Sequence, residues 1–162
     1  MHSQQIVIAT RNKGKMREFH SLLAGLNLKL VSLDEIDPNR EFKIEEDGNS
    51  FHDNASKKAL LVPTIAEDSG LEVDALAGRP GILSARFSNL NATDQDNNRK
   101  LLELLKDVPL ASRTCRYRAV CVFVTSTMKP LWTEGLCEGI VALEPKGNNG
   151  FGYDPVFYVP EY

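Results

Sequence analysis

The sequence predicts an α/β protein built on a mixed β-sheet. In the first half of the chain, short apolar runs alternate with stretches of helical periodicity, which is the pattern of α/β units. In the second half, two long strand-like segments follow one another with no helix between them, so part of the sheet is expected to be antiparallel. The chain has 162 residues, and we expect residues 1–162 to form a single domain.

The first expected elements are a strand, a polar turn, a helix and a second strand. Residues 5–9 (QIVIA) form a short β-branched run typical of a buried strand, and residues 10–15 are the polar turn. Apolar side chains then recur at helical spacing over residues 16–23, and Gly25 ends the helix. The apolar segment 28–33 is the second strand.

A second helix is expected to begin at Ser50. Ser50 and Asp53 have the spacing of a capping box, and Pro63 ends the helix. Residues 65–66 then lead, as a short strand, into an acidic turn at residues 67–70.

A third helix and three more strands are expected in the second half. Thr93 as N-cap, with Asp96 at the third helical position, marks the start of the helix. Residues 117–125 and 131–143 are strand-like, and residues 156–159 form a last apolar segment after a glycine-rich turn.

Composition and charge exclude several classes of protein. The formal net charge of −3 disfavours binding to a nucleic-acid polymer, because such proteins usually carry a basic surplus. No apolar run is long enough to span a bilayer, and the first residues lack the pattern of a signal peptide. We therefore expect a cytoplasmic protein that does not bind membranes. The three cysteines lack metal-type spacing and are interpreted as small buried hydrophobic residues: Cys115, Cys121 and Cys137.

The polar turn at residues 10–15 is a candidate phosphate site. A strand that ends in a polar turn and opens a helix directs backbone N–H groups and the positive end of the helix dipole to one place. Lys13 and Lys15 add positive charge there. The alternative is a polar turn with a solvated, basic helix start.

Two acidic segments are candidate metal or base sites. They lie at residues 45–47 and 67–68, and carboxylates are ligands that Mg²⁺ prefers. Because Asp68 directly follows an apolar strand, a catalytic role is favoured for it, the alternative being a turn-forming side chain. Glu46 and Asp47 are interpreted as solvated loop residues.

A glycine-rich segment at residues 147–155 carries two aromatic side chains, Phe151 and Tyr153. Glycines let a backbone approach a ligand closely, and aromatic rings stack on nucleobases. The alternative is a hairpin loop whose aromatic rings pack on the core.

From the pattern alone, Lys58 is interpreted as a solvated helical lysine. Three arginines are interpreted as exposed strand residues: Arg113, Arg116 and Arg118. A phosphate turn, an acid and an aromatic loop together indicate a nucleoside triphosphate ligand.

Three motifs resemble those of the inosine/xanthosine triphosphate pyrophosphatase family. The first is Ile8-Ala9-Thr10-x-Asn12-x-x-Lys15, near the N-terminus. The central one is Ala66-Glu67-Asp68-Ser69-Gly70-Leu71, followed by Leu76-x-Gly78-x-Pro80-Gly81-x-x-Ser84-Ala85-Arg86. The third is Gly150-Phe151-Gly152-Tyr153-Asp154-Pro155-x-Phe157. The resemblance runs in order over nearly the whole chain.

The resemblance implies Mg²⁺-dependent hydrolysis of non-standard purine triphosphates such as ITP, dITP and XTP. The products are the nucleoside monophosphate and pyrophosphate, and the reaction cleanses the nucleotide pool. The resemblance also implies an elongated mixed α/β fold, with a nucleotide cleft between two lobes, and a homodimer.

The resemblance also implies roles for individual residues. Asp68 is the proton acceptor and a metal ligand, Glu45 is the second metal ligand, and Lys15 and Lys58 stabilise charge at phosphorus. One carboxylate cannot freely do both tasks, and the alternative is that the metal acts mainly by acidifying the water. The residues expected to bind substrate are Thr10, Arg11, Asn12, Lys13, Gly14, Lys15, Ser69, Phe151, Gly152, Tyr153 and Asp154.

The sequence departs from the family pattern in two places. Family members continue past the position of Tyr162 with a segment that carries a Ser-His-Arg motif, and the stretch between Ala59 and Pro63 is shorter here than usual. Two alternative functions follow. One is a related house-cleaning pyrophosphatase that acts on modified pyrimidine nucleotides, and the other is a truncated or inactive remnant that binds nucleotide without turnover.

Overall fold

The computed structural model describes residues 4–42, 46–59, 64–125 and 129–160. Within these residues six strands form one sheet in the order β2-β1-β3-β4-β5-β6. Their bounds are Gln4–Ile8 (β1), Leu28–Ser32 (β2), Thr64–Val73 (β3), Thr114–Val124 (β4), Leu131–Val141 (β5) and Phe157–Tyr158 (β6). β1 pairs in parallel with both β2 and β3, whereas β5 and β6 are antiparallel, which confirms the predicted mixed sheet.

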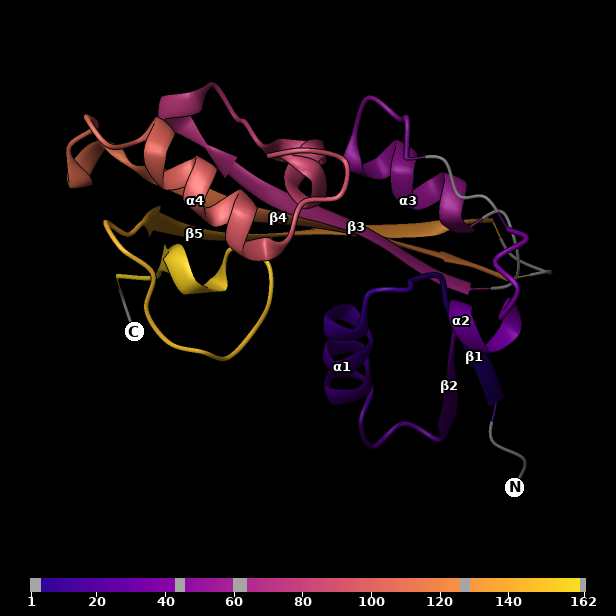
Figure 1. Ribbon diagram of the computed structural model, residues 1–162. Helices are drawn as coiled ribbons and strands as arrows, with labels where there is room; N and C mark the ends of the chain where they lie inside the picture. The colour runs from indigo at the N-terminus through magenta and orange to yellow at the C-terminus, as the bar shows by residue number, and fades with distance from the viewer. Residues whose placement is uncertain (1–3, 43–45, 60–63, 126–128, 161–162) are drawn as a thin grey trace. The chain divides into compact units, whose positions relative to one another are not determined.

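Four α-helices and four short 3₁₀ segments complete the described fold (Figure 1). The α-helices are Lys13–Leu22 (α1), Leu33–Ile36 (α2), Phe51–Ala59 (α3) and Asp94–Leu104 (α4). The 3₁₀ segments are Asp74–Leu76 (η1), Gly81–Arg86 (η2), Leu110–Ser112 (η3) and Asp154–Val156 (η4).

The chain divides into two compact units. The first consists of Met1–Asp68 and Val120–Glu134, and the second of Ser69–Ala119 and Gly135–Tyr162. β3, β4 and β5 each contribute residues to both units.

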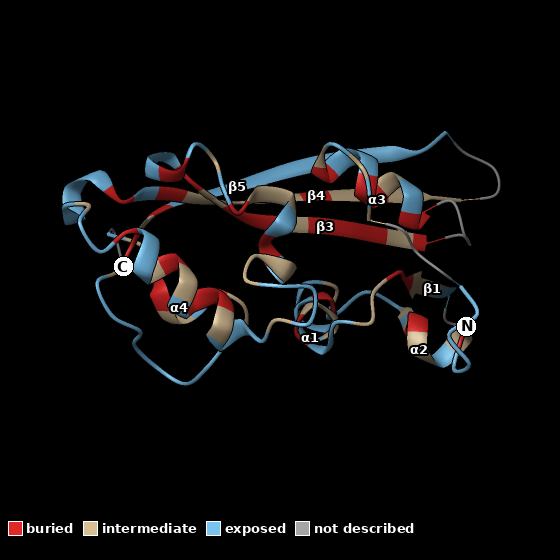
Figure 2. Ribbon diagram, turned by 45° about the horizontal axis from the view of Figure 1, so that its top comes forward, coloured by how far each residue is buried: buried red, intermediate tan, exposed pale blue. Residues whose placement is uncertain are grey.

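The first unit contains the parallel part of the sheet. Its core is formed by buried residues of β1, β2, β3, β4 and the adjoining helices, and β3 is buried along its length (Figure 2). Phe19 turns the apolar face of α1 inward, and Ala55 lets α3 pack closely because it is small and fully buried. This packing brings three parts of the unit close together: the end of β1, the residues Glu67 and Asp68 of β3, and the helix α3.

The second unit has its own hydrophobic core. Leu101 and Leu105 of the α4 region pack with Leu71, Val141 and Val156, and all five are fully buried. α4 begins as predicted, because the Thr93 hydroxyl accepts the Asp96 N–H while the Asp96 carboxylate accepts the Thr93 N–H. Leu104 at the end of α4 and Leu110 of η3 are exposed.

Two parts of the expected secondary structure were wrong. Residues 67–70 are not a turn but the middle of the ten-residue strand β3. Their polar side chains can be buried in a strand because they find partners on other elements, described below. The short helix α2 was not expected. It begins with a capping box between Ser32 and Glu35, and its four residues are too few to show a helical period in the sequence.

Three residues lie differently from their predicted places. Cys115 is buried, but Cys121 is only partly buried and Cys137 is exposed. Arg113 is buried rather than exposed, and its guanidinium donates to the carbonyls of Leu105, Val108 and Ala142. Arg113 therefore links the chain that follows α4 to the residue that follows β5. Arg116 is on β4 and forms ion pairs with carboxylates of its own unit.

Candidate functional site

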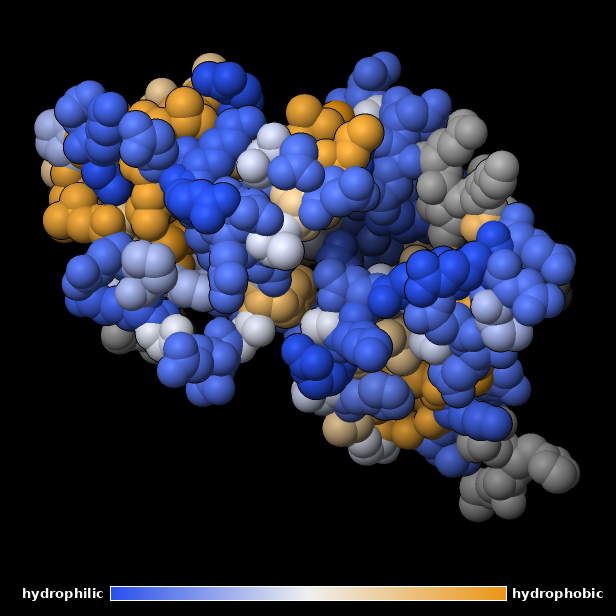
Figure 3. Space-filling model, viewed as in Figure 1, coloured by the Kyte–Doolittle hydropathy of each residue, from blue (hydrophilic) through white to orange (hydrophobic). Residues whose placement is uncertain are grey.

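The turn between β1 and α1 is built around Asn12. Its side chain accepts the N–H groups of Gly14, at 2.7 Å, and Lys15, at 3.3 Å, so Asn12 is the N-cap of α1. The Thr10 hydroxyl in turn accepts the Asn12 N–H at 3.1 Å. The helix therefore begins at Lys13, inside the segment 10–15 that was predicted as a turn, and its start is ordered by local side chains. Hydrophilic residues cover this part of the surface (Figure 3).

Lys15 reaches from this turn to β3. Its Nζ lies 2.6 Å from Oε2 of Glu67, and both side chains are largely buried. The contact follows from sheet order: β1 and β3 are parallel neighbours, with Ile8 opposite Ile65, so residues after Ile65 lie beside the turn that follows β1. Lys13, by contrast, is exposed.

Asp68 lies next to Glu67 on β3 and is also buried. Its Oδ1 accepts a hydrogen bond from Lys58 Nζ at 2.8 Å, and its Oδ2 accepts one from Asn54 Nδ2 at 3.2 Å. The Asn54 Oδ1 accepts the Gly48 N–H at 2.9 Å, which ties this carboxylate indirectly to the loop before α3. Asp68 is thus held from both oxygens, and the turn-forming alternative for it is wrong.

Lys58 is buried on α3, so its interpretation as a solvated lysine is also wrong. Its ammonium contacts three acceptors: Asp68 Oδ1, the Glu67 carbonyl at 3.1 Å and Glu46 Oε1 at 2.6 Å. Asn54 and Lys58 are four residues apart and therefore project from the same face of the helix toward Asp68.

Burial and charge act in opposite directions on this pair. Burial raises the pKa of the Asp68 carboxyl above its ordinary value, and the Lys58 ammonium cancels part of that rise. At Lys58, burial acts to lower the pKa, but the carboxylates of Asp68 and Glu46 outweigh it and hold the pKa above its ordinary value. Lys58 therefore stays charged, while Asp68 is shifted toward accepting a proton.

The loop before α3 places two acids differently from expectation. Glu46 is not a solvated loop residue, because it forms the ion pair with Lys58. Asp47 does lie at the surface, where it forms an ion pair with the exposed Lys57. Glu45, the expected second metal ligand, lies outside the described residues, as does the stretch 60–63 of the shortened segment.

The donor set near Lys58 fits a hard divalent cation. Asp68 and Glu46 both contact Lys58 Nζ, so the oxygens of two carboxylates lie close together around one ammonium. Mg²⁺ commonly takes only one or two protein carboxylates and completes its shell with water and substrate phosphate. Among the described residues no group of three or more His, Cys, Asp or Glu side chains is placed to hold a metal by itself.

In the second unit, the glycine-rich motif forms a tightly held loop. The Gly152 N–H donates to the Asp94 carboxylate at 2.7 Å, and the Gly152 carbonyl accepts from the Asn98 side chain at 3.0 Å. Two side chains of α4 therefore satisfy both backbone groups of this glycine. The Asp154 carboxylate accepts the Phe151 N–H at 2.9 Å and so closes the loop on itself.

The two aromatic residues of this loop differ in burial. Tyr153 is buried in the core, and its hydroxyl donates to the Ser84 carbonyl at 2.9 Å, as the core-packing alternative predicts. Phe151 is only partly buried. Ser69, another expected substrate contact, is a partly buried residue of β3.

Sequence reasoning did not give three polar residues that shape the site their observed places, namely Glu46, Asn54 and Glu67: the two acids lay in the candidate acidic segments, but their partners were not predicted. For Asn54, the signal was its position four residues before Lys58, which places both on one helix face. For Glu67, it was an acid directly beside Asp68 in an otherwise apolar segment. No feature of the sequence distinguishes Glu46 from the neighbouring acids, because its role depends on the position of α3.

Comparison with known proteins identifies close relatives. Residues 6–162 match the model of the Ham1 family. The chain is 48% identical to the dITP/XTP pyrophosphatase of Desulforamulus reducens over 98% of this chain and 81% of the relative. It is 44% identical to the protein of the same name from Escherichia coli strain K12, over 97% of this chain and 82% of the relative.

Solved structures agree with the sequence comparison. The Staphylococcus aureus Ham1 protein superposes with a TM-score of 0.82 at 38% identity, covering 98% of this chain and 82% of that one. A HAM1 protein from Coxiella burnetii also gives a TM-score of 0.82, at 37% identity, with 98% of this chain and 83% of that one covered. By sequence and by fold, the chain belongs to the Ham1 family.

Proposed function

We propose that this chain is a nucleoside triphosphate pyrophosphatase that hydrolyses dITP, ITP and XTP to the monophosphate and pyrophosphate. The observation that carries the proposal is the buried contact of Lys58 with Asp68, beside the phosphate turn that ends in Lys15. Relatives that are 42 to 48% identical are named dITP/XTP pyrophosphatases, which supports the same activity here.

The triphosphate binds at the turn between β1 and α1. Lys13 and Lys15 supply positive charge, and the first N–H groups of α1 are directed toward the same place. Thr10, Asn12 and Gly14 shape the backbone of the turn. Lys15 exchanges part of its contact with Glu67 for phosphate oxygens when substrate binds.

The chemical step is attack of water on the α-phosphorus. Asp68 accepts a proton from that water, a bond forms between the water oxygen and phosphorus, and the bond from the α-phosphorus to the bridging oxygen breaks. Pyrophosphate leaves with the electron pair of that bond. Lys58 and Lys15 stabilise the negative charge that develops on the phosphoryl oxygens.

Mg²⁺ is the expected cofactor, and Asp68 with Glu45 or Glu46 would hold it. When bound, the ion neutralises phosphate charge and lowers the pKa of a bound water. The carboxylates of Asp68 and Glu46 support this assignment, because they lie close together around Lys58 and offer the oxygen ligands that Mg²⁺ prefers.

The base is proposed to bind at the loop Phe151–Asp154, with Phe151 as a stacking surface. Ser69 is the proposed contact from β3.

Within the described residues no helix is both long and apolar enough to cross a membrane. A cytoplasmic homodimer that binds neither nucleic-acid polymers nor membranes remains our prediction for the assembled protein.

Release of pyrophosphate from dITP, XTP and dATP, with and without Mg²⁺, tests the proposal. We expect metal-dependent release from dITP and XTP well above that from dATP. Asp68→Asn should lower kcat by about 10²-fold or more, because it removes the proton acceptor. Asp47→Asn is the matched control: it removes an exposed carboxylate of the acidic loop and should leave the rate unchanged.

Other outcomes would replace the proposal with one of its rivals. Faster release from modified pyrimidine triphosphates than from dITP would indicate the house-cleaning enzyme for pyrimidines. Nucleotide binding without release of pyrophosphate from any substrate would indicate an inactive remnant.

A further inference from the structure

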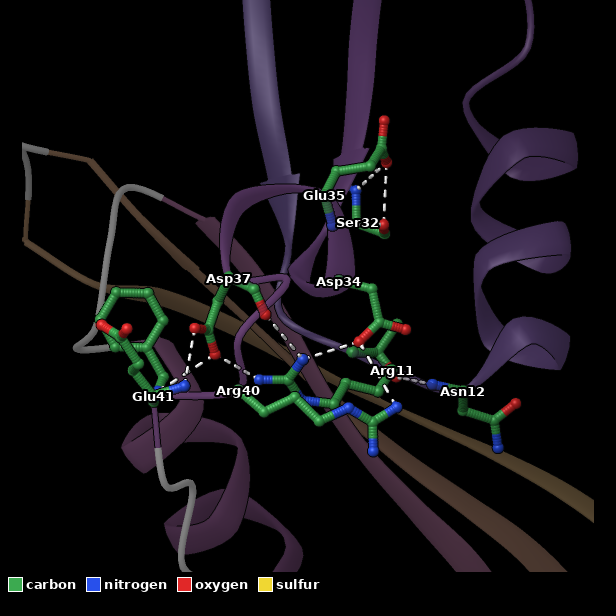
Figure 4. A network of polar contacts seen from close by, with 10 residues as sticks. Arg11, Asn12, Ser32, Asp34, Glu35, Asp37, Arg40 and Glu41 are labelled. Carbon is green, nitrogen blue, oxygen red and sulfur yellow. Dashed lines mark hydrogen bonds and ion pairs between the residues drawn. The ribbon is translucent and has the colours of Figure 1, made fainter.

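Arg11 occupies the middle of the phosphate turn, but its side chain does not point out of the turn into free solvent. Its Nη1 donates to Asp34 Oδ1 at 2.7 Å and to the Asp37 carbonyl at 3.3 Å, and its Nη2 donates to the Asp37 carboxylate (Figure 4). Both terminal nitrogens of the guanidinium are therefore directed to α2 and the residue that follows it.

Asp37 is buried and connects Arg11 to a second stretch of backbone. Its Oδ1 accepts the Glu41 N–H at 2.8 Å, and its Oδ2 accepts the Phe42 N–H at 3.1 Å as well as the Arg11 guanidinium (Figure 4). A buried carboxylate needs such partners, because desolvation of an unpaired charge is costly. Asp37 thus joins the turn that binds phosphate to the loop that leads into the acidic segment.

The backbone of the turn follows the same path. The Leu33 N–H donates to the Thr10 carbonyl at 3.4 Å, and Asn12, the residue after Arg11, caps α1. Arg11 therefore sits between two fixed points, the start of α2 and the start of α1. A shift of its guanidinium would move the N–H groups of Gly14 and Lys15 as well.

We infer that Arg11 is a positioning residue, which holds the phosphate turn in place through Asp34 and Asp37 instead of binding the triphosphate with its own side chain. The inference rests on the proposed pyrophosphatase function and refines the role of one of its expected substrate-binding residues. Its backbone remains part of the turn.

Arg11→Lys distinguishes the two roles. A lysine keeps the positive charge and is itself a good phosphate ligand, so it would largely replace an arginine that contacts phosphate as a charge. It cannot donate from two nitrogens to Asp34 and Asp37 together. We therefore expect Arg11→Lys to lower kcat/KM by roughly tenfold to a hundredfold, through a higher KM, because small misplacements of a binding group cost this much.

Asp37→Asn provides the second arm. It weakens the same contact from the other side, so its KM should also rise, and the double variant should lose little more than either single variant. If Arg11 binds phosphate directly, Asp37→Asn frees its guanidinium, KM stays the same or falls, and the two effects add. That result, or wild-type kinetics in Arg11→Lys, would overturn the inference.

Arg99→Lys is the matched control, since Arg99 forms an exposed ion pair with Asp96 at 2.6 Å. Its KM should equal that of the wild type. Thermal unfolding of all variants separates positioning from general destabilisation, because a purely structural loss lowers the midpoint without raising KM in the folded enzyme.

The wild-type protein tells failure of the inference from failure of the proposed function. If it releases no pyrophosphate, the proposed function fails, and hydrogen exchange of residues 10–16 then tests the inference. Faster exchange of these residues in Arg11→Lys than in Arg99→Lys supports the positioning role of Arg11, and equal exchange rejects it.

Discussion

Lys58 Nζ lies 2.8 Å from Asp68 Oδ1, and both side chains are buried. Breaking a buried ion pair by removing one partner is strongly destabilising, and the pair itself contributes little net stability compared with apolar packing. The burial of this pair is therefore better explained by the proposed chemistry than by a gain in stability. Glu46 provides a second carboxylate for the same ammonium, so Lys58 remains charged when Asp68 takes up a proton.

Replacing Lys58 by methionine should lower kcat by about a hundredfold or more, because in the proposed mechanism its buried positive charge stabilises the phosphoryl oxygens. The pKa of Asp68 should rise further, since it loses the neighbour that opposes the effect of burial. The rate of pyrophosphate release measures the first effect, and the acid limb of the pH–rate profile measures the second.

Lys57→Met is the control for that experiment. Lys57 is the adjacent residue of α3, but it is more exposed and forms its ion pair with Asp47 at the surface. Exposed pairs contribute little, so activity and stability should change only slightly. Equal losses in the two variants would contradict the role assigned to Lys58.

Asp37 should make stability depend on pH. Burial acts to raise its pKa, but hydrogen bonds from the Glu41 N–H, Arg11 and the Phe42 N–H outweigh burial, so the pKa lies below the ordinary value of 3.8. A depressed pKa in the folded state stabilises the protein above the unfolded-state pKa, and this contribution is lost as pH falls through the folded-state pKa.

The free energy of unfolding of Asp37→Asn should therefore lie furthest below that of the wild type at neutral pH. The difference should shrink as pH falls below about 4, where the wild-type carboxyl is protonated as well. Urea unfolding at a series of pH values measures it, with Asp107→Asn, an exposed residue outside this network, as the control. A difference that stays constant with pH would show that the Asp37 charge is not what stabilises the contact.

Gly150→Ala should impair the motif loop more than Gly147→Ala. Both glycines have positive φ, +84° and +76°, so alanine is strained at either position by about 1–2 kcal/mol. Only at Gly150 would a Cβ also overlap the Asp154 carboxylate, whereas nothing lies within 4 Å of one at Gly147.

Because Asp154 holds the Phe151 N–H, Gly150→Ala should also raise the KM for dITP. Gly147→Ala should lower stability with little change in KM. Steady-state kinetics and thermal unfolding of both variants provide the comparison. Equal KM values in the two variants would remove the loop from the substrate site.

Much of the fold was predictable because its signals are local. The N-cap of α4 depends on a side chain within three residues of the backbone group whose hydrogen bond it accepts, so Thr93 was predicted from the chain. Asn12 caps α1 in the same local way, but it was not predicted as a cap, because the apolar period begins only at residue 16. The apolar runs of β1 and β2 and the helical period of α1 are local in the same sense. Residues 67–70 were misjudged, because polar residues look like a turn when their distant partners are unknown.

The sequence by itself therefore determined the mixed α/β class, the polar turn between the first strand and the first helix, and the choice of Asp68 as the acid of interest. Only the tertiary structure decided that Lys58 is buried and pairs with Glu46, and that Lys15 pairs with Glu67. It also decided that the Arg11 guanidinium is bound to Asp34 and Asp37. The physical reason is the same for each: the partners are 9 or more residues apart and meet only because β1 pairs with β2 and β3, and because α3 packs against β3.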